Sequence, residues 1–85
     1  MIHMSKYSER FAAALAAELR AQKARRRVSD DDIAEATGTH RVSVSRYLSG
    51  ARAIPLTVFA DMCDYLQIAP TEVIDEAEKN ARRDA

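Results

Sequence analysis

The stretch SDDDIAEATGTHRVSVSRYLSG, residues 29–50, decides the fold of this 85-residue chain. It predicts two short helices joined by a tight turn. Ser29 and the three aspartates after it can cap the free N–H groups of the first helix and suit its dipole. Gly38 ends that helix, because glycine adopts the left-handed conformation at little cost. Thr39 or His40 then caps the second helix.

The second helix, predicted over residues 41–49, has two different faces. At 100° per residue, Val44, Tyr47 and Leu48 share one side. The opposite side spans an arc of roughly 140° and carries Arg41, Val42, Ser45, Arg46 and Ser49. Because this side has two arginines, two serines and no acid, it suits base edges and phosphates. We expect one face to pack in the core and the other to contact a partner.

Residues 28–55, VSDDDIAEATGTHRVSVSRYLSGARAIP, resemble the Cro/repressor (XRE-like) family of bacterial and phage helix-turn-helix regulators. The resemblance rests on an ordered set of features at the family's spacing: the pair Ile33-Ala34, the turn glycine Gly38, a serine-rich second helix and the closing glycine Gly50. With the flanking helices, it covers most of the chain.

The resemblance implies an all-α fold, a compact five-helix bundle of the lambda-repressor-like DNA-binding type, whose third helix enters the major groove. We expect residues 1–85 to form a single helix-turn-helix domain, with the motif at about residues 29–50. The residues expected to contact bases are Arg41, Val42, Ser45 and Arg46, and those expected to contact phosphates are Lys23, Arg27, His40, Ser49 and Arg52.

Three positions depart from the family pattern. Asp30 stands where many relatives have a glutamine that contacts the DNA backbone, and phosphate would repel a carboxylate. Leu48 replaces a frequent glutamate, and Lys23 stands where the arginine partner of that glutamate usually lies. We therefore expect apolar packing in place of the family's buried ion pair, since losing both partners together need not lower stability.

The formal net charge of the chain is zero, but its distribution is uneven. Residues 1–27 carry seven basic and two acidic side chains, whereas residues 51–85 carry four and seven. A local positive patch is enough to attract DNA, and overall neutrality mainly lowers non-specific affinity. The basic run Lys23 to Arg27 suits either a solvated helix end or phosphate contacts, and Arg52 either a phosphate contact or an exposed loop.

Three further helices are predicted, over residues 8–24, over residues 56–67 and from Thr71, as the N-cap, to about Arg82. The side chains expected in the core are Phe11, Leu15, Leu19, Leu56, Phe59, Cys63, Leu66, Val73, Ile74 and Ala77. A second apolar stripe, Val58, Met62 and Tyr65, is either covered by other helices or shared with another subunit. Together with Val73 and Ile74, it is the candidate surface for a homodimer.

The sequence favours a sequence-specific, DNA-binding transcriptional regulator, and in particular a small phage-type or bacterial repressor that acts by occupying a palindromic operator in double-stranded DNA. An antitoxin of a toxin–antitoxin pair and a protein–protein adaptor that has lost DNA binding are the alternatives. The chain carries no recognisable catalytic or metal-binding set, so we expect no enzyme activity, no cofactor and no small-molecule ligand. One cysteine, with no apolar span or further domain, predicts a cytoplasmic protein without a membrane partner.

Overall fold

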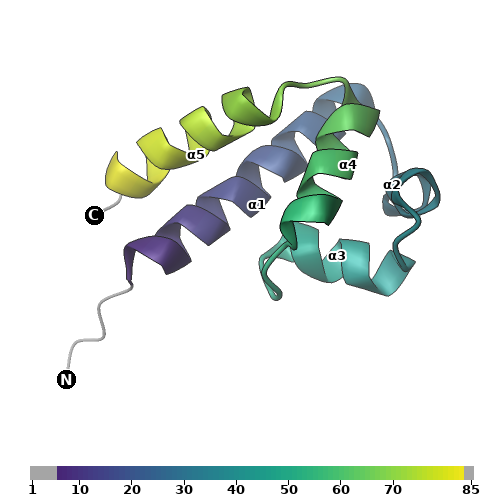
Figure 1. Ribbon diagram of the computed structural model, residues 1–85, viewed down its shortest axis with the longest axis horizontal. Coiled ribbons are helices and arrows are strands. Elements are labelled where there is room, and N and C mark those ends of the chain that lie inside the picture. The colour runs from purple at the N-terminus through teal and green to yellow at the C-terminus, as the bar shows by residue number, and fades with distance from the viewer. Residues whose placement is uncertain (1–5, 84–85) are drawn as a thin grey trace.

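A computed structural model describes residues 6–83 of the chain. Figure 1 shows its five helices: α1 (Tyr7–Arg26), α2 (Asp30–Thr37), α3 (Arg41–Ser49), α4 (Leu56–Leu66) and α5 (Pro70–Arg83). This confirms the predicted all-α bundle and its order of elements.

The ends of the helices follow from local chemistry. α1 runs two residues past its predicted end, to Arg26, and Arg27 then ends it in a left-handed conformation with a φ of 54°. α5 begins at Pro70, so Thr71 lies in its first turn and the prediction that Thr71 is the N-cap was wrong. Proline suits the first position of a helix, because its fixed φ is helical and an N–H there has no partner within the helix.

The core gathers buried side chains from all five helices. Its fully buried members include Leu19, Ile33, Val44, Met62, Cys63 and Val73, each with an exposed fraction of 0%. Two expected core residues lie elsewhere: Leu56 is 77% exposed at the start of α4, and Ile74 is 39% exposed on α5. Leu56 is the first residue of α4, at the end of the helix, and Ile74 follows the buried Val73 on α5. Phe11 and Leu15 are partly buried on α1.

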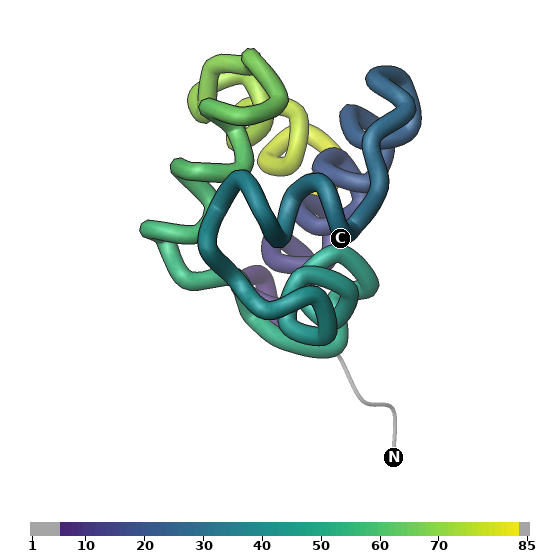
Figure 2. The backbone as a smooth tube through the Cα atoms, turned by 90° about the vertical axis from the view of Figure 1, so that its right-hand side faces the viewer, coloured from purple at the N-terminus to yellow at the C-terminus, as the bar shows by residue number. Residues whose placement is uncertain are grey.

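α5 lies along α1, and this is the most extensive contact between any two helices (Figure 1). The buried side chains of α5 are small, Val73, Ala77 and Ala81, which lets the two helix backbones approach closely. At one end of the pair, the Arg82 guanidinium lies 4.6 Å from the centre of the Tyr7 ring. Figure 2 shows α2 in front of the bundle with α3 below it, so the predicted motif forms one side of the molecule.

Candidate nucleic-acid interface

The two faces of α3 are the ones that the sequence predicted. Val44, Tyr47 and Leu48 are buried, with exposed fractions of 8% or less. The residues on the opposite face, Arg41, Val42, Ser45, Arg46 and Ser49, are all exposed. Leu48 therefore packs in the core, as expected for an apolar residue that replaces one half of an ion pair.

Four side chains that were predicted to contact bases line one shallow hollow on the surface. The hollow has a volume of about 330 Å³, and its lining consists of Asp30, Arg41, Val42, Ser45 and Arg46. Val42 is 51% exposed, so it presents an apolar side chain beside the two arginines. The arrangement offers guanidinium and hydroxyl donors together with one apolar contact, which is the chemistry that base edges in a major groove can accept.

Both ends of α3 are fixed by its own residues. His40 is the N-cap, and its Nδ1 accepts a hydrogen bond from the Val42 N–H at 3.4 Å, which decides between the two residues predicted for that role. Gly50 ends α3 in the left-handed conformation with a φ of 84°. The Ser49 hydroxyl donates to the Arg46 carbonyl oxygen at 3.0 Å. His40 and Ser49, predicted to contact phosphate, thus also hold the ends of the helix.

The start of α2 is a capping box. The Asp32 N–H donates to Ser29 Oγ, and the Ser29 N–H donates to Asp32 Oδ2, both at 3.0 Å. The hydrogen bond from the Ser29 backbone, and after it the Ser29 side chain, lower the pKa of the Asp32 carboxyl. Gly38 ends α2 with a φ of 66°, which confirms the predicted turn. The capped ends fix where α3 begins relative to α2.

Two ion pairs join the remaining aspartates of α2 to basic residues that were predicted to contact DNA. Lys23 Nζ lies 2.6 Å from Asp30 Oδ1, and each of these side chains is just over one quarter exposed. Arg41 Nε lies 3.0 Å from Asp31 Oδ1, with exposed fractions of 70% and 69%. Neither pair was predicted from the sequence, because each connects two different helices and has no fixed spacing along the chain.

The first of these pairs changes the interpretation of Lys23. Its ammonium group is held by Asp30 across the junction of α1 and α2, so Lys23 offers less to phosphate than a free lysine would. The same contact offsets the charge of Asp30, which stands where many relatives have a glutamine that contacts the DNA backbone. Two of the three residues that depart from the family pattern, Lys23 and Asp30, therefore form one ion pair.

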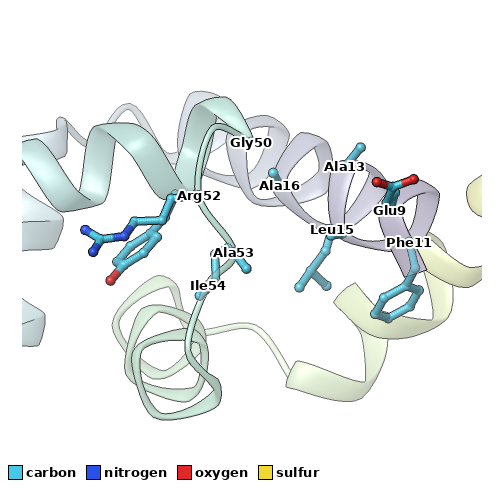
Figure 3. Close-up of a pocket in the computed structure, with 11 residues that line it drawn as sticks. Glu9, Phe11, Ala13, Leu15, Ala16, Gly50, Arg52, Ala53 and Ile54 are labelled. Carbon is cyan, nitrogen blue, oxygen red and sulfur yellow. The ribbon is translucent and has the colours of Figure 1, made fainter. Parts of the chain in front are cut away.

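Arg27 and Arg52 are both exposed. Arg27 is the C-cap of α1, and Arg52 lies in the connection that follows α3. A groove of about 520 Å³ between that connection and α1 is lined mainly by apolar side chains, including Phe11, Leu15 and Ile54. Figure 3 shows Arg52 extending away from the α1 side of this groove. Its guanidinium is thus presented to solvent.

The predicted dimer surface is only partly available. Met62 and Val73 are fully buried, so the expectation that they meet a second copy was wrong; neighbouring helices cover them instead. Val58 is partly buried against the core. Tyr65 and Ile74, both 39% exposed, are the members that remain on the surface.

Cys63 is a free cysteine buried in the core. Burial raises the pKa of the Cys63 thiol to about 11, which keeps it protonated at neutral pH. Among residues 6–83, no three histidine, cysteine, aspartate or glutamate side chains are grouped so that they can hold a metal ion. In the same part of the chain, none of the helices has the length and apolar character needed to cross a membrane.

Comparisons with known proteins agree with this geometry. The crystal structure of the clp gene regulator ClgR from Corynebacterium glutamicum superposes with a TM-score of 0.80 at 24% sequence identity, over 87% of this chain and 79% of that one. A search of the curated proteins found no match. Residues 14–76 match a family model described as a helix-turn-helix domain. Because that match spans most of the chain and the fold agrees, the chain belongs to the helix-turn-helix family of DNA-binding domains.

Proposed function

We propose that the protein is a sequence-specific transcription regulator that acts by occupying an operator, as a small bacterial or phage-type repressor does. The observation that carries this proposal is the α3 surface. Arg41, Val42, Ser45 and Arg46 share one exposed hollow on the helix that the family places in the major groove. The structural similarity to a clp gene regulator supports a role in gene regulation.

The proposed contacts divide into two classes. Arg41, Val42, Ser45 and Arg46 contact base edges, where an arginine can donate two hydrogen bonds to a guanine. Arg27, Arg52, His40 and Ser49 contact phosphates around this helix, with Lys23 in a weaker role because Asp30 holds it. Base contacts determine the sequence that is bound, and phosphate contacts determine how strongly any duplex is bound.

A homodimer is the proposed unit on DNA. One helix reads only a few base pairs, so a second copy is needed to single out a site in a genome. Half-sites of a palindrome then lie about one helical turn apart, roughly 34–36 Å. Tyr65 and Ile74 are the exposed apolar side chains that we assign to the contact between copies. Because this surface is small, we expect the free protein to be a monomer at low concentration.

A mobility-shift assay at several salt concentrations tests the proposed DNA binding. With about 4–8 phosphate contacts per dimer, the slope of log K against log salt should be on the order of −4 to −7. Lys79→Ala is the matched control, because Lys79 lies on α5 in an exposed pair with Asp75, away from α3. The control should bind like the wild type, whereas Arg46→Ala should bind more weakly.

A flat salt response, or the absence of a shift at low salt, would reject DNA binding and favour the protein–protein adaptor. Footprinting on a selected duplex tests the dimer separately. Protection of one asymmetric half-site with one chain per duplex would refute the dimer and leave DNA binding intact.

A further inference from the structure

The three aspartates that begin α2 have three different partners. Asp32 forms the capping box with Ser29, and Asp30 pairs with Lys23 at the junction with α1. Asp31 is the one that pairs with a side chain on the exposed face of α3, since its Oδ1 lies 3.0 Å from Arg41 Nε. The first two contacts account for the folding of this segment, whereas the third concerns a side chain proposed to contact bases.

We propose that Asp31 is a positioning residue that sets the sequence discrimination of Arg41. A guanidinium group has five N–H donors arranged in a plane. Asp31 engages the Nε edge, and the donors on the two terminal nitrogens remain for a partner. Two of these donors can bond the O6 and N7 atoms of guanine. This inference rests on the proposed DNA binding.

The exposure of the pair indicates that its role lies in binding. Both side chains are about 70% exposed, and such surface pairs contribute little to stability. The Lys23–Asp30 pair is much less exposed and joins two helices, so its role is structural. A contact that adds little to folding, yet holds a base-contacting arginine, affects mainly how that arginine meets DNA.

Asp31 should raise the affinity for a duplex that carries the recognised guanine and lower the affinity for other sequences. At a duplex with guanine in the right place, it holds Arg41 in the orientation needed for two parallel hydrogen bonds. On other sequences, Arg41 would act as a mobile cation that pairs with any phosphate. Asp31 opposes that pairing, because it competes for the guanidinium and because its own charge repels phosphate. Both effects increase the discrimination between the recognised sequence and other sequences.

The test uses two duplexes, one selected from a random library by the wild-type protein and one of scrambled sequence. Asp31→Asn removes the charge and keeps the shape. It should bind the scrambled duplex about two- to fivefold more tightly and the selected duplex about fivefold more weakly. Opposite shifts of this kind are not expected from a general change in stability or net charge.

Two variants serve as controls. Asp75→Asn removes the same charge from a similarly exposed ion pair on α5, with Lys79 3.4 Å away. It should change the affinities for both duplexes in the same direction by less than about twofold. In an Arg41→Ala background, Asp31→Asn should change the ratio of the two affinities by less than about twofold, because the pair no longer exists.

The outcomes separate this inference from the proposed function. If Asp31→Asn and Asp75→Asn shift both duplexes equally, the effect is one of net charge and the positioning role is refuted, while DNA binding stands. The same holds if Asp31→Asn changes the affinity ratio as strongly without Arg41 as with it. A wild-type protein that binds no duplex refutes the proposed function itself.

Discussion

The helix-turn-helix unit (α2, the turn and α3, residues 30–49) and the α1–α5 pair are built in different ways. Each end of α2 and α3 has a local cap, supplied by Ser29, Gly38, His40 and Gly50. The α1–α5 pair is held along its length by small buried side chains packed between two long helices. The difference shows that the shape of the unit is specified over a few residues, whereas the pair depends on tertiary packing.

Substitutions in these two regions should therefore affect different properties of the protein. Substitutions of α1 side chains that pack in the core should lower the free energy of unfolding, because tertiary packing is what mainly stabilises the α1–α5 pair. Changes on the exposed face of α3 should alter DNA binding and leave stability nearly unchanged.

The largest expected effect is on stability, from Leu19→Ala. Leu19 is fully buried on α1, and truncating such a leucine costs about 2–5 kcal/mol through lost burial and a cavity. Leu56→Ala is the matched control, because Leu56 is 77% exposed and its truncation should change stability by no more than about 0.5 kcal/mol. Urea unfolding measures both. Similar losses for the two leucines would contradict the observed packing of α1 against the core.

The next effect is on binding, from Arg46→Ala. Removing an arginine that contacts a base should cost about 1–3 kcal/mol on the selected duplex and relax discrimination at one base pair. The urea midpoint should not move, because Arg46 is exposed. Mobility-shift titrations on the selected duplex and on single-base variants measure the change.

Arg52→Ala tests the proposed division between base contacts and phosphate contacts. As a phosphate contact in the connection after α3, Arg52 should contribute equally to all sequences, and its loss should reduce the salt slope by about 1. If Arg46→Ala and Arg52→Ala lower specific and random binding by the same factor, the division into base and phosphate contacts is wrong.

Gly38→Val should lower the free energy of unfolding by at least about 1 kcal/mol. A Cβ at Gly38 would meet no heavy atom within 4 Å, so the cost arises from the φ of 66° alone. Gly38→Asn is the control, because asparagine tolerates the left-handed conformation better than a β-branched residue does. Thermal melts of both variants test this: equal melting temperatures would show that backbone conformation is not what requires glycine here.

The features that were predicted correctly from the sequence are those that depend on residues close together in the chain. The turn at Gly38, the closing Gly50 and the two faces of α3 follow from caps and from a period of 3.6 residues, and all were confirmed. The predicted end of α1 was two residues short, because composition does not predict that an arginine, Arg27, adopts the left-handed conformation that ends the helix.

The features that were missed depend on how helices are arranged. Leu56 and Met62 belong to one apolar helix, yet one is exposed and the other fully buried, since the arrangement of neighbouring helices decides which positions are covered. The Arg41–Asp31 pair joins residues of two helices across the turn. No spacing rule within a single helix relates them, so the candidate site was predicted without one of its charges.

The smallest expected effect concerns pH and the cap of α2. Hydrogen bonds from the Ser29 backbone and then its hydroxyl lower the pKa of Asp32 from its ordinary 3.8, so the folded protein holds the ionised carboxylate more tightly than the unfolded chain does. The stabilisation is therefore present above pH 3.8 and is lost as the pH falls through the lowered pKa. Asp32→Asn should melt slightly below the wild type at pH 7, and the two melting temperatures should converge in acid. A difference that persists unchanged at the lowest pH would mean that the charge of Asp32 does not stabilise the cap, whereas convergence would add an electrostatic term to the local specification of the helix-turn-helix unit.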